Sequence, residues 1–452
     1  MTKPKKILNI PEDSVEEFIE GLLLQYPNHL VRLEKHHVVL ASQQQDTVKL
    51  ISGGGSGHEP SHAGWIGQGM LSAAVCGGMF ASPSVAAVLS AILTIGRDNT
   101  GVLLIIKNYT GDRLNFGVAA ERANLMGVPV RTIVVADDCA LPRTKGVTGA
   151  RGLAGTVLVH KIAGAAAAAG ASLEGCHAVA RRVCARMGTL GIALDAVTVP
   201  GASDVNNRLD DEDTIEIGLG IHGEAGLKQS KLLTADEMAA EMVQTIQNYG
   251  RTDDRDSSKI IPFVKPGDEV VILVNNLGGT SNFEMSILAR SCVRVLEGRT
   301  YQVKVSRVLV GSYMTSFDMH GASLTILNVT EQPDMVEYLD APCTAPAWGK
   351  CDVWNTQAGD RPSLKRVTEA RRGTASLALS QPTCTIADFE ITAKQVLQSA
   401  STALSEAEPL LTKYDTVVGD GDCGITSKFK LHNVFFGFVC LETLGKRRPI
   451  SS

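Results

Sequence analysis

Residues 50–65 read LISGGGSGHEPSHAGW, and this stretch decides how the first half of the chain folds. A short apolar run leads into glycines, and a histidine, an acid and a proline follow directly. Glycines at the end of a strand let the backbone approach a ligand and turn its N–H groups into donors. The stretch is not a Walker A loop, because that motif requires a Lys-Ser/Thr pair after the glycines and none is present. It is not a GxGxxG motif either, because His58 stands where the last glycine would be. A tight turn with a capping histidine is an equally good interpretation of these residues alone.

The sequence around this stretch predicts a parallel sheet covered on both faces. Apolar runs rich in β-branched residues predict strands over Val48–Ser52, Val102–Lys107 and Val130–Ala136. Between the last two, Arg113–Met126 has the pattern of an amphipathic helix that stops at Gly127. These segments form a βαβ unit.

A long apolar run follows the opening stretch. Between Pro60 and Arg97 there is no Asp, Glu, Lys or Arg, a composition that also occurs in membrane spans. We reject a span because Gly77, Gly78 and Pro83 divide the run into two short halves. We expect instead a buried helix, a Gly-rich loop and a second helix.

A second α/β block covers about residues 195–328. GDEVVILVNNLGG and YQVKVSRVLVG predict strands, the segment between them predicts a helix ending at Gly298, and DMHGASLTILNV predicts another strand. The periodicity dissolves from 341 to 383, which indicates a linker. Apolar residues then repeat at helical spacing from Phe389 to Leu404, and we expect Pro409 to close this helix.

The predicted organisation is therefore an α/β fold in two halves followed by the start of a helical domain. We place the halves, with parallel or mixed sheets, at about residues 7–194 and 195–340. A linker covers 341–384, the helical segment 385–430, and a divergent tail 431–452.

Composition points to a small-molecule partner. The formal charge is −5 over 452 residues, with acids and bases interspersed, which favours neither nucleic acid nor an anionic membrane. Ten cysteines occur without a CxxC pair, so we expect reduced thiols rather than a disulfide framework or a zinc site. The N-terminus lacks a signal-peptide pattern, and we expect a cytoplasmic protein.

Polar residues of KNYTGDRLNFG follow the second predicted strand. Lys107 and Asp112 would lie near His58 if the two strands are neighbours, because ligands of parallel sheets bind beyond the carboxyl ends of the strands. An exposed lysine and an aspartate that caps the next helix are the alternative interpretation.

Two later motifs also suggest chemistry. In GLGIHGEAG, the neighbouring glycines leave His222 free to act as a base or a nucleophile, although an uninvolved histidine is the commoner case. In YDTVVGDGDCG, Asp415, Asp420 and Asp422 offer hard oxygen ligands suited to Mg²⁺ and, through it, to nucleotide phosphates. An acidic turn that caps a helix is the alternative for this motif.

Taken together, these motifs resemble the ATP-dependent dihydroxyacetone kinase family. GGGSGHEP, KNYTGDRLNFG, RGLAGTVLVHK, GLGIHGEAG, VNNLGG and GDGDCG occur in that family's order, over roughly residues 7–430. The resemblance implies a substrate domain of two α/β halves joined by a linker to an all-helical nucleotide domain. It also implies that only the start of the nucleotide domain is present here.

The resemblance assigns roles to residues. It implies that His222 holds the ketone carbon of dihydroxyacetone as a hemiaminal, which explains why a polyol such as glycerol is not held. Either Asp112 or His58 could take the proton from the hydroxyl that attacks ATP, and we favour Asp112 as base, with His58 assisting. The implied substrate contacts are Gly55, Ser56, Gly57, His58, Lys107 and Asp112. The implied Mg²⁺ ligands are Asp415, Asp420 and Asp422, and the implied phosphate neighbours are Asp422, Cys423, Gly424 and Ile425.

Two function hypotheses follow from the resemblance. The first is a kinase that phosphorylates dihydroxyacetone, and glyceraldehyde as well, with ATP and Mg²⁺. The second is a triose-binding protein without catalysis, because the nucleotide domain is incomplete. Cleavage of FAD to AMP and cyclic FMN is linked to the first. The resemblance further implies a homodimer.

Overall fold

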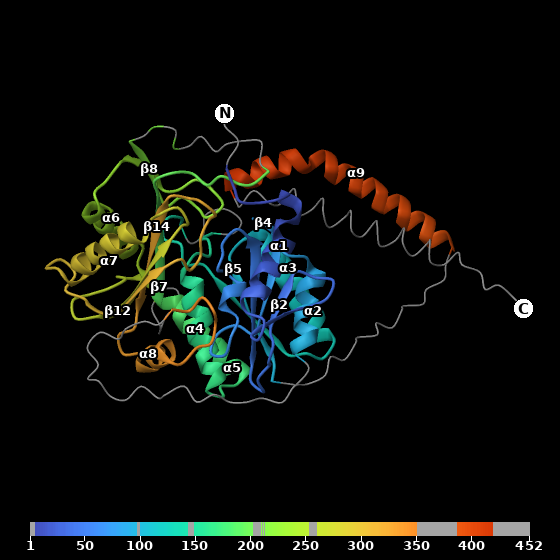
Figure 1. Ribbon diagram of the computed structural model, residues 1–452, viewed down its shortest axis with the longest axis horizontal. Coiled ribbons are helices and arrows are strands. Elements are labelled where there is room, and N and C mark those ends of the chain that lie inside the picture. Colours follow the sequence, from blue (N-terminus) through green and yellow to red (C-terminus); the bar gives the residue numbers. More distant parts are fainter. Residues whose placement is uncertain are drawn as a thin grey trace, which may run out of the picture. The chain divides into compact units, whose positions relative to one another are not determined.

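The computed structural model describes residues 5–96, 100–142, 149–201, 209, 211, 213–252, 260–349 and 387–418. The chain divides into two units, residues 1–364 and 365–452. The described part of the first unit contains two six-stranded sheets with helices between them and on their outer faces (Figure 1).

The first sheet carries the opening stretch. Its strands lie in the order β1 (Leu30–Arg32), β2 (Val38–Ala41), β4 (Ala73–Met79), β3 (Lys49–Ser56), β5 (Val102–Lys107) and β6 (Val130–Val135). The last four are parallel, and β1 and β2 join antiparallel at one edge. Along β5, Leu103 and Ile105 face one core while Leu104 faces the other. This confirms the predicted parallel arrangement with both faces covered.

Helices cover both faces of this sheet. The residues of α2 (Val85–Ile95) and α3 (Thr110–Leu125) form one core with it. On the other face lie α1 (Ser14–Gln25), α4 (Gly155–Ala168) and α5 (Leu173–Arg186). The small side chains of α4 are buried almost throughout, because this helix packs in the core that joins the two sheets (Figure 1).

The second sheet is mostly antiparallel. Its order is β13 (Lys304–Gly311), β12 (Glu269–Asn276), β14 (Gly321–Asn328), β7 (Met187–Ala193), β8 (Thr214–Ile217) and β9 (Lys228–Lys231), and only β12 and β13 among these neighbours are parallel. The three strands predicted in this block are β12, β13 and β14. The sequence analysis did not predict β7, β8 or β9.

Helices α6 (Ala235–Tyr249) and α7 (Asn282–Glu297) cover the outer face of the second sheet. Both begin with a capping box, Thr234 with Glu237 and Ser281 with Glu284. Helix α7 ends just before Gly298, as predicted. The remaining elements of the first unit are α8 (Pro333–Asp340), the short hairpin of β10 (Arg251–Thr252) and β11 (Ile260–Ile261), and the 3₁₀ turns η1 (Pro11–Asp13) and η2 (Ala63–Trp65).

Two predicted elements are wrong. The first half of the apolar run forms strand β4 rather than a buried helix, because its backbone pairs with β2 and β3 and this pairing outweighs alanine's helix propensity. The second half is a helix, α2, as expected. In the part of the chain that is described, no helix has the length and apolar character needed to cross a bilayer.

The other wrong element concerns the second unit. Its described part is the helix α9 (Ala387–Val418), which continues through Pro409 instead of closing there. A proline inside a helix removes one backbone hydrogen bond, and here helical turns on both sides carry the backbone through it. Asp415 lies in the last turn of this helix, while the GDGDCG motif at residues 419–424 lies outside the described residues.

Candidate active site

Gly53, Gly54 and Gly55 of the opening stretch belong to strand β3, which runs to Ser56 and not only to Ser52. Gly54 has a φ of +152°, and a Cβ built on it would lie 3.0 Å from Cε of Lys107 and 3.3 Å from Oδ2 of Asp112. Lys107 ends β5, the parallel neighbour of β3, and Asp112 lies in the first turn of α3. The missing side chain at Gly54 therefore leaves room for both predicted site residues.

Lys107 and Asp112 are both buried rather than exposed. Ser82 donates a hydrogen bond to Oδ1 of Asp112 at 2.6 Å. The Nζ atom of Lys107 lies 5.3 Å from the ring centre of Tyr109. The alternative of an exposed lysine is therefore wrong.

Two histidines from different sheets meet at this edge. His58 follows β3, and His222 lies in the glycine-rich turn after β8. Their Nε2 atoms are 3.0 Å apart, and Nδ1 of His58 lies 2.7 Å from the carbonyl oxygen of Thr315. Burial, followed by the charge of Lys107, lowers the pKa of His58 well below its usual value.

Glu224 completes the histidine pair. Its Oε1 lies 2.9 Å from Nδ1 of His222, and its Oε2 accepts the backbone N–H of the same residue at 3.0 Å. Burial raises the pKa of Glu224, but the charge and hydrogen bond of His222 and the charge of Arg151 outweigh this and bring it to about 2. The sequence analysis did not single out Glu224, although it stands within the quoted GLGIHGEAG motif.

The protons of this chain of contacts can be counted. From the Thr315 carbonyl through His58 and His222 to Glu224 there are three contacts, and the acceptors at both ends carry no proton. A positively charged His222, the state whose charge lowers the pKa of Glu224, supplies a proton for each of the three contacts, whereas two neutral imidazoles supply only two. When the two protons of the neutral pair occupy the outer contacts, Nε2 of His222 is unprotonated. The neutral pair is therefore the state in which His222 can attack a carbon atom.

Aromatic side chains enclose the pair. Phe80 stacks on His58 with a centroid distance of 4.8 Å, and it also contacts the ring of Phe317. Tyr109 meets His222 edge to face at 4.8 Å. Phe80 and Phe317 both have a positive φ, of 50° and 47°. These three rings come from three loops that are far apart in the chain, so no local sequence pattern indicated that they would meet.

The remaining predicted residues of the loop are partly engaged within the protein. The Ser56 hydroxyl donates to the carbonyl of Gly77 at 2.8 Å, and the Gly57 N–H donates to Glu59 at 2.9 Å. Gly55 lies against the backbone of Phe80. The Ser56 side chain is thus turned toward β4.

The second histidine of the opening stretch lies deeper. Nδ1 of His62 is 2.9 Å from Nε2 of His160 on α4, and both rings are fully buried. Burial, followed by the charge of Lys107, lowers the pKa of His160 to about 3. This pair is neutral at physiological pH and belongs to the packing behind the site.

Of the nucleotide-binding residues predicted from the sequence, only Asp415 lies within the described residues. It is buried near the end of α9. Asp420, Asp422, Cys423, Gly424 and Ile425 lie outside the described residues. Among the described residues, no group of three or more His, Cys, Asp or Glu is arranged to hold a metal ion. The six cysteines for which the structure gives a state are free thiols.

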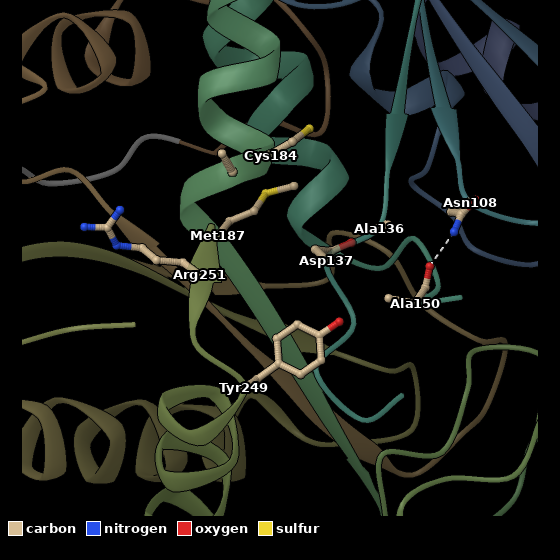
Figure 2. A pocket seen from close by; sticks show the side chains of 9 residues that line it. Asn108, Ala136, Asp137, Ala150, Cys184, Met187, Tyr249 and Arg251 are labelled. Atoms are coloured by element: carbon tan, nitrogen blue, oxygen red, sulfur yellow. Dashed lines mark hydrogen bonds between the residues drawn. The ribbon is translucent and has the colours of Figure 1, made fainter. Parts of the chain in front are cut away.

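A separate polar cavity of about 250 Å³ lies beyond the end of β6 (Figure 2). Asn108, Asp137, Cys184 and Tyr249 are among its lining residues. Asp137 accepts the N–H groups of Leu153, at 2.7 Å, and of Gly155 at the start of α4, at 2.9 Å. This carboxylate therefore caps α4.

Comparison with known proteins gives matches over most of this chain. Residues 20–347 match the family model described as the Dak1 domain. The chain is 41% identical over 432 residues to triokinase/FMN cyclase of Homo sapiens, covering 93% of this chain and 70% of that protein. It is 43% identical over 345 residues to the dihydroxyacetone-binding subunit DhaK of PTS-dependent dihydroxyacetone kinase 1 of Listeria innocua, covering 76% of this chain and 100% of that subunit.

A solved structure extends the likeness. The crystal structure of the dihydroxyacetone kinase of C. freundii in its native form matches with a TM-score of 0.69 and 33% sequence identity, covering 96% of this chain and 74% of that one. The same kinase in complex with AMP-PNP and Mg²⁺ matches with a TM-score of 0.68. This chain therefore belongs to the dihydroxyacetone kinase family, with its Dak1 domain at residues 20–347.

Proposed function

We propose that this chain phosphorylates dihydroxyacetone with ATP, holding the substrate as a hemiaminal on His222. The observation that carries the proposal is the position of His222 between Glu224 and His58. Its Nδ1 is 2.9 Å from the carboxylate, and its Nε2 is 3.0 Å from Nε2 of His58. The relatives named triokinase and dihydroxyacetone kinase support the same reaction, and they do not favour the alternative of a triose-binding protein without catalysis.

Capture of the ketone requires no added reagent, because the proton that the alkoxide needs comes from the His222 ring. The Nε2 lone pair of His222 bonds to the carbonyl carbon, so the ring becomes an imidazolium and the oxygen becomes an alkoxide. One proton then leaves Nδ1 through Glu224 and reaches that oxygen, which gives a neutral hemiaminal. Glycerol has no electrophilic carbon and is excluded from this step.

Phosphoryl transfer requires a base near a substrate hydroxyl. We assign this role to Asp112, with His58 assisting, since both are buried at the same sheet edge as Lys107. Lys107 and the backbone of Gly55, Ser56 and Gly57 would position the hydroxyl groups. The bare backbone of the loop allows a three-carbon substrate to lie close to it.

The donor set of the YDTVVGDGDCG segment fits Mg²⁺, because carboxylate oxygens are the hard ligands that this ion prefers. Asp415, Asp420 and Asp422 would hold the ion, and Cys423, Gly424 and Ile425 would lie beside the phosphates. When bound, Mg²⁺ neutralises phosphate charge. The solved kinase that holds AMP-PNP and Mg²⁺ supports ATP and Mg²⁺ as cofactors.

Relatives that carry the name FMN cyclase support a second activity, the cleavage of FAD to AMP and cyclic FMN. It would be detected as release of AMP from FAD. Use of glyceraldehyde, the homodimer, the cytoplasmic location and the domain limits remain predictions.

The test of the main proposal is ADP release by the full chain with Mg-ATP and dihydroxyacetone. Glycerol, His222→Ala and Asp420→Ala serve as controls. Release that requires the ketone, His222 and Asp420 supports the proposal. Equal release with glycerol would contradict it.

A further inference from the structure

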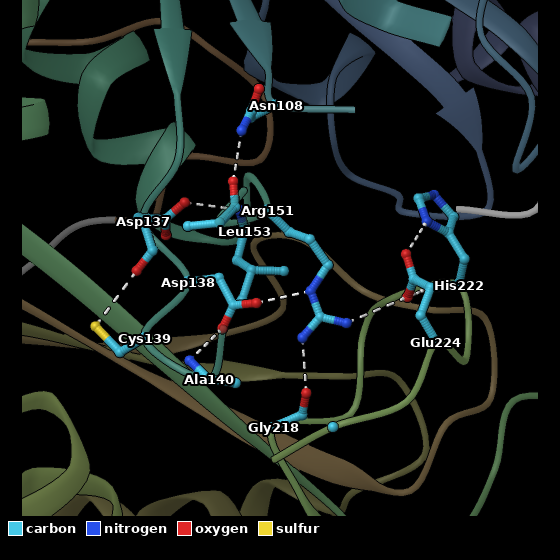
Figure 3. Close-up of polar contacts among 12 residues, drawn as sticks. Asn108, Asp137, Asp138, Cys139, Ala140, Arg151, Leu153, Gly218, His222 and Glu224 are labelled. Atoms are coloured by element: carbon cyan, nitrogen blue, oxygen red, sulfur yellow. Dashed lines mark hydrogen bonds and ion pairs between the residues drawn. The ribbon is translucent and has the colours of Figure 1, made fainter. Parts of the chain in front are cut away.

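Arg151 lies directly behind the carboxylate that holds His222 (Figure 3). It comes from the connection between β6 and α4, and its side chain is 6% exposed. Its Nε donates to Oδ2 of Asp138 at 2.7 Å, and its Nη2 donates to the carbonyl of Gly218 at 2.7 Å. These two bonds fix the plane of the guanidinium.

The third nitrogen of this guanidinium points at the site. Nη1 of Arg151 lies 3.8 Å from Oε2 of Glu224 and has no hydrogen-bond partner among the residues that the structure describes. Its charge acts on a carboxylate that already accepts two bonds from His222. Arg151 thus contributes to the site through Glu224, without contact to the reacting atoms.

A glycine makes room for this contact. A Cβ built on Gly220 would collide with both Oε2 of Glu224 and Nη1 of Arg151. Gly220 also donates its N–H to the carbonyl of Glu224 at 2.9 Å, so the turn closes on itself. The turn that presents His222 is therefore shaped to bring these two charges together.

The charges around Glu224 can be summed. His222 faces it from its own turn, Arg151 from the β6–α4 connection, and Asp138 stands behind Arg151. Tyr109 adjoins the His222 ring, and His58 lies beyond it. Two carboxylates and one guanidinium leave one negative charge. That charge favours the imidazolium that forms on His222 as its Nε2 bonds to carbon.

We propose that Arg151 is a positioning residue for the nucleophile: anchored by Asp138 and Gly218, it keeps Glu224 ionised and aligned on Nδ1 of His222. This rests on the proposed hemiaminal chemistry. An ionised Glu224 must accept a proton from Nδ1, and this leaves Nε2 with its lone pair. A protonated Glu224 would instead donate to Nδ1, and the ring proton would move to Nε2 and block attack.

The loss of the Arg151 cation sets the direction of the pH effect. Without this opposite charge beside it, the ionised form of Glu224 is less favoured, so Glu224 binds a proton at higher pH. Protonation of Glu224 removes the free lone pair on Nε2 of His222. The pH below which ketone capture is lost therefore rises in Arg151→Met, by about one to three units for the loss of one close charge.

The experiment is ¹³C NMR of carbonyl-labelled dihydroxyacetone with the full chain, titrated downward from neutral pH. Capture moves the labelled carbon from the ketone to the tetrahedral region. We expect the capture midpoint to rise in Arg151→Met and to return partway in Arg151→Lys, which retains the charge but not the two anchoring bonds. We also expect Gly220→Ala to weaken capture, because the added Cβ would push Glu224 and Arg151 apart.

Arg307→Met is the matched control. Arg307 is also a buried arginine, paired with Asp340 and away from His222. It should lower stability without moving the capture midpoint. Because Arg151→Met leaves Asp138 buried without its cation, Asp138→Asn/Arg151→Met is measured too. This double variant removes one positive and one negative charge, so its midpoint should rise less than that of Arg151→Met, but it should still rise because the cation 3.8 Å from Glu224 is lost.

The outcomes separate the two proposals. If the wild-type chain captures the ketone but Arg151→Met and the double variant keep the wild-type midpoint, Arg151 is only structural and this inference is wrong. If the wild-type chain leaves the ketone signal unchanged, the hemiaminal proposal fails, and this inference fails with it.

Discussion

The Nε2 atoms of His58 and His222 lie 3.0 Å apart, although 164 positions separate the two residues in the sequence. His58 follows a strand of the first sheet, and His222 follows a strand of the second. The site therefore depends on the packing that joins the two sheets. Side chains of α4 belong to the core that also contains residues of both sheets.

The contact between Glu224 and His222 leads to a first prediction. Glu224→Gln removes the charge that accepts the Nδ1 proton, so we expect ketone capture to weaken by about tenfold to a hundredfold, the usual range for a lost charged hydrogen bond. The labelled-ketone NMR titration measures it. Glu284→Gln, in an exposed capping box far along the chain, is the control and should leave capture unchanged. Undiminished capture in Glu224→Gln would show that the carboxylate is dispensable.

Two glycine variants should have opposite effects. Gly54→Ala places a Cβ against Lys107 and Asp112 at a positive φ, so we expect lower stability and a higher KM for dihydroxyacetone. Gly117→Ala lies in the middle of α3 with open space around it, and it should stabilise the protein by about 0.5–1 kcal/mol through helix propensity. Thermal unfolding and initial rates measure both. Equal effects of the two variants on KM would contradict the predicted role of Gly54.

The buried pair His62 and His160 predicts acid sensitivity. Burial lowers the folded-state pKa of His160 to about 3, against a usual value near 6.5. Below the unfolded pKa the unfolded chain binds a proton that the folded chain does not, so stability is complete above about pH 6.5 and declines as the pH falls toward 3. The contribution is a few kcal/mol at most.

This is measured by urea unfolding at several pH values. His160→Gln has no imidazole to protonate, and its free energy of unfolding should fall less steeply between pH 6.5 and 3 than that of the wild type. His177→Gln is the control, since His177 lies in α5 apart from the pair. Parallel curves for His160→Gln and the wild type would show that the pair does not titrate as predicted.

Trp65 should be the most costly aromatic to remove. It is fully buried, stacks on Tyr313 at 5.8 Å and donates its Nε1–H to Ser61 at 3.0 Å. Trp65→Ala should lower the free energy of unfolding by about 3–5 kcal/mol, because it leaves a cavity. Trp65→Phe should cost less because it keeps most of the ring contact. Chemical denaturation compares the two, and a loss below about 1 kcal/mol in Trp65→Ala would contradict the prediction.

The sequence by itself determined much of the sheet and several of the site residues. Alternation and β-branched runs located β5, β6, β12, β13 and β14, since strands buried on both faces require such residues. The rule that ligands bind at the carboxyl ends of parallel strands led to Lys107 and Asp112. The glycine-rich turns pointed to His58 and His222.

Other features were decided only by the tertiary structure. Strand β4 has a composition that suits a helix, and its pairing with β2 and β3 decided otherwise. Glu224 stands two positions from His222, but its role depends on a turn closed by Gly220. Arg151 and Phe80 come from other segments and carry no local pattern. A side chain's partner across the site depends on long-range packing, and local propensity and periodicity contain no information about that packing.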